Sequence, residues 1–148
     1  MNMKFYLDCE FNSFGGELIS LALASADCEK CFYEVLPYEH MNLHPWVEAN
    51  VIPVLFRKPK SDIAKFKNNL AQFLRENAVN NEITIVADWP DDIRYFCEAL
   101  ITGPGQSNPT PNIIFIMDRV NLVNTAEYSL TPHNALEDAK ALARGDNE

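Results

Sequence analysis

Three short apolar segments stand within the first 38 residues, and they constrain the fold more than any other feature of the chain. They are rich in the aliphatic and aromatic side chains that β-strands favour, and they span residues 3–9, 17–27 and 31–38. Only the polar turn Cys28-Glu29-Lys30 separates the second segment from the third. The sequence therefore predicts a β-meander at the start of the chain.

The rest of the chain alternates between helical and strand-like patterns. Apolar residues recur on one helical face after Ser61, a residue type that favours the start of a helix. Another helix is predicted to open with Pro90 and acidic residues in its first turn. In chain order we expect a loop with one short helix (39–60), a helix (61–77), a central strand (82–87), a helix (89–101), a flexible connection (102–112), a strand (113–117) and a helix (133–144).

The element order β-β-β-α-β-α-β-α predicts an α/β fold in which helices flank a mixed five-stranded sheet. With 148 residues, of which 47% are apolar, the chain is long enough for one domain (1–148) with a buried core. No apolar run approaches the ~18 residues of a membrane span, and the first residues lack the basic flank of a signal peptide. We therefore expect a cytoplasmic protein.

The net charge of −9 argues against some classes of nucleic-acid-binding protein but not against others. Proteins that coat DNA tightly need a basic surface. An enzyme that binds phosphates through metal ions needs clustered acids instead, so the charge is compatible with a metal-dependent nuclease. The four cysteines include one Cys28-x-x-Cys31 pair, but Cys9 and Cys97 do not supply the second pair of a zinc site, and we expect reduced thiols.

Asp8 and Glu10 stand at the end of the first apolar segment, in the stretch FYLDCEF. Alternate side chains of a strand point to the same face, so the two carboxylates are predicted to lie side by side near the core. Burial and mutual repulsion both oppose the ionisation of such a pair. A divalent cation is the simplest group that compensates for both effects.

Two later segments also place acids at the ends of core elements. Asp88 ends a predicted strand, and Asp91 and Asp92 open the helix after it. His133 and Asp138 lie at the start of the last helix. Each segment alone is ordinary, because acids near a helix start interact favourably with the helix dipole. Together the acids form a set of oxygen ligands that suits Mg²⁺ or Mn²⁺.

The order of these segments resembles the DEDDh 3′–5′ exonucleases of the ribonuclease-H-like superfamily. The matching stretches are FYLDCEF from Phe5, IVADWPDDIRYF from Ile85 and HNALEDAKALA from His133, and they are spread over most of the chain. The last is the most specific, because family members carry H-x-A-x-x-D followed by small apolar residues, and Ala135 fits this pattern. The short length and the compact first motif are most similar to the small bacterial and phage exoribonuclease branch.

The resemblance implies a ribonuclease-H-like fold and two-metal hydrolysis of phosphodiester bonds from the 3′ end. By similarity, Asp8 would bridge two Mg²⁺ or Mn²⁺ ions, Glu10 and Asp138 would complete the first metal site, and the acid of the middle motif would hold the second ion. His133 would be the general base that takes a proton from the attacking water. Histidine suits that role, because its ordinary pKa of about 6.5 leaves the imidazole neutral at working pH.

The middle motif departs from the family pattern, which commonly places an Asn and an aromatic residue ahead of the Asp. Here the stretch is ADWPDDIRYF, which is one residue shorter and has no Asn. Asp92 is our first choice, because Tyr95 and Phe96 follow it as apolar residues follow the family Asp. Asp88 is the second choice and Asp91 the third.

Substrate contacts are predicted at two aromatic residues and one basic segment. Phe11 follows the D-x-E, where related enzymes place an apolar side chain against the terminal nucleotide, and Trp89 is a candidate for stacking or for covering the helix start. The segment 57–67 holds five of the twelve basic residues, and it either contacts a phosphate backbone or is a solvated helix start. The branch implies single-stranded RNA or a 3′ overhang as substrate, with DNA and a homodimer as further options.

Other functions are compatible with the same residues. A DNA 3′–5′ exonuclease or a phosphoesterase for small nucleotides would use the same acids and differ in its substrate pocket. A catalytically silent nucleic-acid-binding module of this fold is the alternative from another class, and the presence of four acids and the histidine disfavours it. A calcium-binding domain is disfavoured because the sequence has no D-x-D-x-D-G loop.

Overall fold

The computed structural model describes residues 3–119 and 129–146. Its centre is a mixed five-stranded sheet made of β1 (Met3–Phe11), β2 (Leu18–Ser25), β3 (Cys31–Val35), β4 (Glu82–Ala87) and β7 (Asn112–Met117). The strands lie in the order β3-β2-β1-β4-β7. β1, β2 and β3 pair antiparallel, as the predicted meander requires, whereas β4 runs parallel to both β1 and β7.

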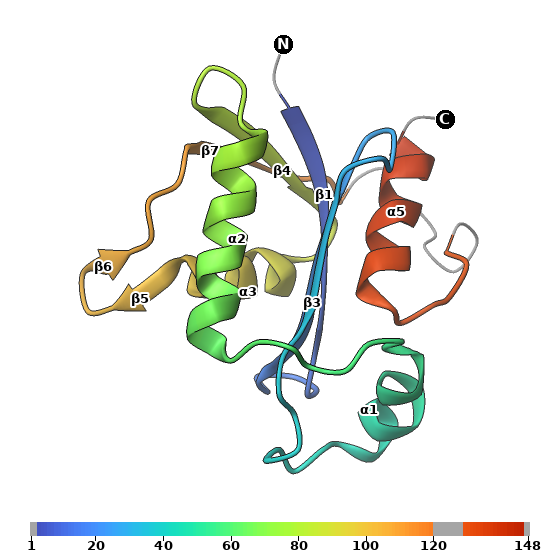
Figure 1. Cartoon of the computed structure of the whole chain (residues 1–148). Helices are drawn as coiled ribbons and strands as arrows, with labels where there is room; N and C mark the ends of the chain where they lie inside the picture. The colour runs from blue at the N-terminus through green and yellow to red at the C-terminus, as the bar shows by residue number, and fades with distance from the viewer. Residues whose placement is uncertain (1–2, 120–128, 147–148) are drawn as a thin grey trace.

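Helices cover both faces of the sheet (Figure 1). α2 (Ile63–Asn77) and α3 (Pro90–Leu100) lie on one face, and α5 (Ala135–Asp146) lies on the other. α1 (Pro45–Asn50) and the short 3-10 helix η1 (Ile52–Val54) lie on the same side as α5, near its first residues. None of the described helices is long and apolar enough to cross a membrane.

The predicted α/β class and mixed five-stranded sheet are confirmed, but the predicted element order is incomplete. A small hairpin of β5 (Ile101–Gly103) and β6 (Gln106–Ser107) begins at the last residue of the predicted helix 89–101 and continues into the segment 102–112, which the sequence predicts to be a flexible connection. Gly105 has a φ of +66°, a left-handed conformation that glycine adopts without strain, and this allows the tight turn. The segment whose glycine and proline content predicts a loop therefore contains a hairpin.

The start of α2 differs from the prediction by one residue. Asp62, not Ser61, caps the helix, because its carboxylate accepts a hydrogen bond of 2.8 Å from the backbone N–H of Lys65. The predicted apolar face is largely confirmed, and its buried residues are Phe66, Leu70, Ala71 and Leu74. This face anchors α2 on the sheet.

The start of α5 lies at Ala135 and not at His133 as predicted. His133 has a φ of +71°, and a left-handed residue cannot be part of a right-handed helix. The side-chain oxygen of Asn134 accepts a hydrogen bond of 3.1 Å from the backbone N–H of Glu137 and so caps the helix. His133 therefore stands just before the helix, on a turn, and its orientation is set by that turn.

The two faces of the sheet are packed with side chains of different sizes. The face under α2 and α3 is filled by large residues of the three central strands and of both helices, including Phe5, Leu7, Leu21, Leu23, Ile83, Ile85, Phe66 and Phe96. On the opposite face, Ala22 and Ala24 of β2 belong to one cluster with Ala135 and Ala139 of α5. Small side chains at the contact allow a helix to approach its neighbour closely. This close approach brings Asp138 of α5 near the acids of β1.

Candidate metal centre

The last part of β1 extends beyond its neighbour β4. β4 pairs with β1 only from Met3 to Tyr6, and among the described residues no strand lies beside the later part of β1 on the β4 side. In sheets with parallel strands, ligands bind outside the carboxyl ends of the strands. Asp8 and Glu10 lie in this part of β1, and β-strand alternation places both on one face, as the sequence predicts.

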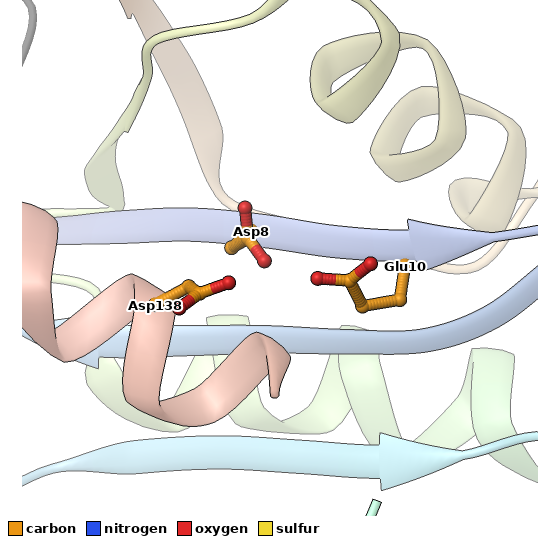
Figure 2. A group of neighbouring side chains, drawn as sticks. All are labelled: Asp8, Glu10 and Asp138. Atoms are coloured by element: carbon orange, nitrogen blue, oxygen red, sulfur yellow. The ribbon is translucent and has the colours of Figure 1, made fainter. Parts of the chain in front are cut away.

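Three carboxylates converge between β1 and α5 (Figure 2). Asp8 and Glu10 come from the strand and Asp138 comes from the first turns of the helix. One oxygen atom from each of the three lies within 4.8 Å of the others. Asp8 and Glu10 are partly exposed, whereas Asp138 is only 8% exposed. The structure thus brings together three of the five residues that the sequence analysis assigns to the catalytic set.

Two oxygen atoms of this cluster are buried without a hydrogen-bond partner among the described residues. They are Oδ2 of Asp8 and Oδ1 of Asp138. Within residues 3–119 and 129–146, no Lys or Arg forms an ion pair with the cluster. A buried polar atom without a partner costs about 1–3 kcal/mol, and more when it is charged. The donor set, three carboxylates with free lone pairs, therefore fits a hard divalent cation such as Mg²⁺ or Mn²⁺.

The protonation of the acids reflects this crowding in the metal-free protein. Burial, followed by the negative charges of Asp138 and Asp92, raises the pKa of Glu10 to about 9. Burial, with Asp92 as the next contributor, also raises the pKa of Asp8 well above its usual range. The pKa of Asp138 is raised as well, chiefly by burial. A bound cation would reverse this effect by favouring the charged carboxylates.

Asp92, the first choice for the fourth acid, is 3% exposed and lies in the first turn of α3. Its Oδ1 accepts a hydrogen bond of 3.2 Å from the backbone N–H of Cys9, the residue between the two acids of β1. Burial, followed by the charge of Asp88, raises the pKa of Asp92 to about 8. Tyr95 and Phe96 are buried behind it, as expected. Asp92 is therefore close to the cluster, but one of its carboxylate oxygens is hydrogen-bonded to the backbone of β1.

The other two candidates for the fourth acid differ in their surroundings. Asp88 follows β4, and its charge raises the pKa values of Asp8, Asp92 and Asp138. Asp91 instead accepts a hydrogen bond of 3.0 Å from Trp89 Nε1 and lies 3.6 Å from Arg94. Asp88 and Asp92 both act electrostatically on the cluster, so the choice between them stays a prediction.

His133 is connected to the cluster through its backbone. Its N–H donates a hydrogen bond of 3.1 Å to Oδ2 of Asp138. Its ring meets the ring of Trp46 edge-to-face, with centroids 4.9 Å apart and planes at 81°. Trp46 was not among the residues predicted from the sequence, because it lies 87 positions before His133 in a proline-bearing loop that carries no motif. This packing restrains the imidazole beside the acids.

An aromatic pocket of about 450 Å³ lies next to Glu10. Phe11, Trp46 and Trp89 line it together with the fully exposed Phe14. Phe11 also stacks on Tyr95, with ring centroids 4.7 Å apart, and this contact restrains the Phe11 ring. The two predicted substrate contacts, Phe11 and Trp89, therefore border one cavity beside the acids. Rings of this kind can stack on nucleobases.

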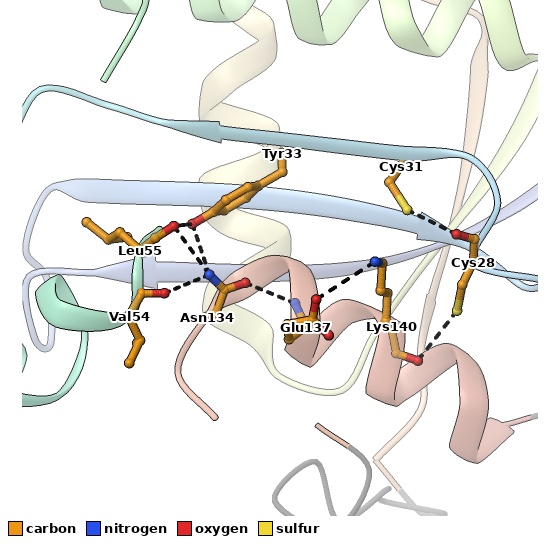
Figure 3. Close-up of polar contacts among 8 residues, drawn as sticks. All are labelled: Cys28, Cys31, Tyr33, Val54, Leu55, Asn134, Glu137 and Lys140. Atoms are coloured by element: carbon orange, nitrogen blue, oxygen red, sulfur yellow. Dashed lines mark hydrogen bonds and ion pairs between the residues drawn. The ribbon is translucent and has the colours of Figure 1, made fainter. Parts of the chain in front are cut away.

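The turn that carries His133 is fastened to the segment after α1 (Figure 3). The amide nitrogen of Asn134 donates to the backbone oxygens of Val54 at 2.8 Å and Leu55 at 3.4 Å. It also lies 3.3 Å from the hydroxyl of Tyr33, which itself donates to the Leu55 oxygen at 2.8 Å. Asn134 is only 2% exposed. This buried network fixes the first turn of α5 relative to β3.

We expect Asn134→Ala to lower the free energy of unfolding by about 1–3 kcal/mol, because it removes the helix cap and leaves the Val54 oxygen without its donor. Thermal unfolding should then occur about 3 °C lower or more. Asn68→Ala is the matched control, since Asn68 is exposed on α2. Equal midpoints for the two variants would show that the network does not stabilise α5.

Comparisons with known proteins add no assignment. The chain matches none of the protein-family models, and a search of the curated proteins finds no significant match. The functional assignment therefore depends on the residues of the site.

Proposed function

We propose that this protein is a metal-dependent 3′–5′ exoribonuclease of the DEDDh type with a ribonuclease-H-like fold. The observation that carries the proposal is the group of three carboxylates from β1 and α5, with two buried oxygen atoms that lack a partner among the described residues. The mixed five-stranded sheet with helices on both faces is compatible with the fold that the motif resemblance implies.

Asp8, Glu10 and Asp138, together with Asp92 or Asp88, would hold Mg²⁺ or Mn²⁺. When bound, two such ions supply an activated water and neutralise charge on the phosphate that is attacked. The imidazole of His133 would serve as the general base for an attacking water, and its edge-to-face contact with Trp46 limits the rotation of the ring. The aromatic pocket beside Glu10 binds the terminal base between its rings.

The test of this proposal uses single-stranded RNA and DNA, each labelled at the 5′ end or the 3′ end. The protein is incubated with them in Mn²⁺, Mg²⁺ or EDTA. We expect metal-dependent release of mononucleotides from the 3′ end, faster for RNA than for DNA. A protein that leaves every polymer intact in Mn²⁺ and Mg²⁺ contradicts the nuclease assignment, and a faster reaction on DNA contradicts the RNA preference.

We expect His133→Ala to lower kcat by about 10²–10⁴-fold, which is the usual contribution of general-base catalysis. Metal binding should persist, because the acids are unchanged and the backbone N–H of residue 133 can still donate its hydrogen bond to Asp138. His40→Ala is the control, since His40 is exposed and paired with Glu17 at 2.8 Å. A His133→Ala variant as active as the control would remove His133 from the mechanism.

A further inference from the structure

A second charged feature lies on the segment that joins η1 to α2. Arg57, Lys58 and Lys60 lie on this segment, Lys65 lies in the first turn of α2, and all four are exposed. They line a surface pocket of about 320 Å³, here called the basic pocket, with Tyr33, Glu34, Val35, Ser61 and Asn69. Four of the twelve Lys and Arg residues thus border one pocket of a chain whose net charge is −9.

The positive charge of the basic pocket is not neutralised within the described residues. The ammonium groups of Lys58, Lys60 and Lys65 form no ion pair there. Glu34 is the one acid in the lining, and its carboxylate accepts a hydrogen bond of 3.4 Å from Asn69. Asp62, which caps α2 beside the pocket, adds a second carboxylate. Four cations against two carboxylates still leave a net positive charge, which favours an anionic ligand.

The residues that line the basic pocket favour phosphates over bases. Arg57 donates a hydrogen bond of 3.0 Å to the backbone oxygen of Tyr33, and its guanidinium carbon lies 5.0 Å from the centre of the Tyr33 ring. Tyr33 belongs to the core under α5 and is only 7% exposed, so it offers no ring face for stacking. Phe56, the residue before Arg57, is 71% exposed. Phe56 is not part of the lining, but an exposed aromatic residue next to a row of cations is a feature of single-strand binding surfaces.

The basic pocket is connected to the candidate metal centre by a short series of contacts. Arg57 packs on Tyr33, the Tyr33 hydroxyl lies 3.3 Å from the Asn134 amide, and Asn134 follows His133. We propose that the basic pocket binds backbone phosphates of the single-stranded substrate several nucleotides upstream of the 3′ end. The upstream placement rests on the proposed function, whereas binding of single-stranded nucleic acid by the pocket does not.

The test measures binding in EDTA, where metal-dependent hydrolysis cannot occur. A fluorescent single-stranded RNA of about 12 nucleotides is titrated by anisotropy at several salt concentrations. The variant is Lys58→Gln with Lys60→Gln, two exposed side chains whose replacement should not affect folding. The control is Lys4→Gln with Lys30→Gln, two exposed lysines that lie outside the pocket. Both double variants change the net charge equally.

We expect the pocket variant to bind at least about tenfold more weakly at low salt than the control. The slope of log affinity against log salt should become shallower by about 1.4, because each phosphate contact on a single strand contributes about 0.7. Equal affinities and equal slopes for the two double variants would overturn the proposal.

Hydrolysis assays separate this proposal from the proposed function. On a dinucleotide, which is too short to reach the basic pocket, the pocket variant should cleave as fast as the wild type, whereas on the longer RNA it should show a raised KM. If the wild type hydrolyses nothing but the salt slopes differ as expected, the nucleic-acid site stands and the nuclease assignment fails. If hydrolysis occurs but the pocket variant has an unchanged KM and salt slope, the basic pocket is not a nucleic-acid site, and the nuclease assignment stands.

Discussion

Asp8→Asn is expected to abolish metal-dependent hydrolysis and, at the same time, to make the metal-free protein more stable. The carboxylate belongs to the cluster with Glu10 and Asp138, one of its oxygens is buried without a partner among the described residues, and its pKa is raised by burial and by neighbouring acids. An amide at this position removes a metal ligand and a charge together. Loss of several kcal/mol of transition-state stabilisation corresponds to a fall of about 10³-fold or more in rate.

The gain in stability follows from the same charges. Because the folded protein raises the pKa of Asp8, ionisation at neutral pH opposes folding when no cation is present. Removal of about 1 kcal/mol of this cost should raise the unfolding midpoint in EDTA by about 2–4 °C. Glu29→Gln, which neutralises an exposed acid in the turn between β2 and β3, is the control for both measurements. An Asp8→Asn variant that keeps its activity, or that is less stable than this control in EDTA, would contradict the metal site.

The stability of the metal-free protein is expected to fall as the pH rises from about 4 to about 9. The pKa of Glu10 is raised from 4.5 to about 9 and that of Asp92 from 3.8 to about 8, burial being the largest cause of both shifts. A raised folded-state pKa means that the folded chain holds more protons than the unfolded chain between the two values. This stabilisation is complete below the unfolded pKa and is lost as the pH passes the folded pKa.

We expect unfolding at pH 9 in EDTA to cost at least about 2 kcal/mol less than at pH 5 and to occur about 4 °C lower or more. Mn²⁺ should restore most of the difference, because a cation that binds only the folded chain stabilises it. Glu10→Gln should flatten the pH dependence in EDTA, whereas Glu29→Gln should not. A midpoint that is constant or rises from pH 5 to pH 9 without metal would show that the acids are not coupled as described.

The sequence allowed the fold class and most of the acid cluster to be predicted because their patterns are local. Strand alternation places Asp8 and Glu10 on one face, and the apolar face of α2 follows from its periodicity. The predicted start of α5 was wrong. The left-handed φ of His133 depends on a turn that Asn134 holds against Val54 and Leu55, and no local pattern predicts those contacts.

The rest of the site depends on contacts between distant segments. The packing of Trp46 on His133 requires α1 to lie beside the first turn of α5, which no local pattern predicts. The sequence shows the basic residues at 57–60, but only the tertiary fold places them around one pocket with Tyr33 and Asn69. The choice between Asp92 and Asp88 stays a prediction, because both acids act electrostatically on Asp8.

Titration of the protein with Mn²⁺ at pH 8, with free Mn²⁺ measured by electron paramagnetic resonance, tests the central claim most directly. We predict that the wild type and Glu29→Gln bind up to two ions per chain and that Asp138→Asn binds fewer or none, because Asp138 supplies the carboxylate from α5. Wild-type protein that leaves all Mn²⁺ free, or an Asp138→Asn variant that binds as the wild type does, would contradict a metal centre at these acids.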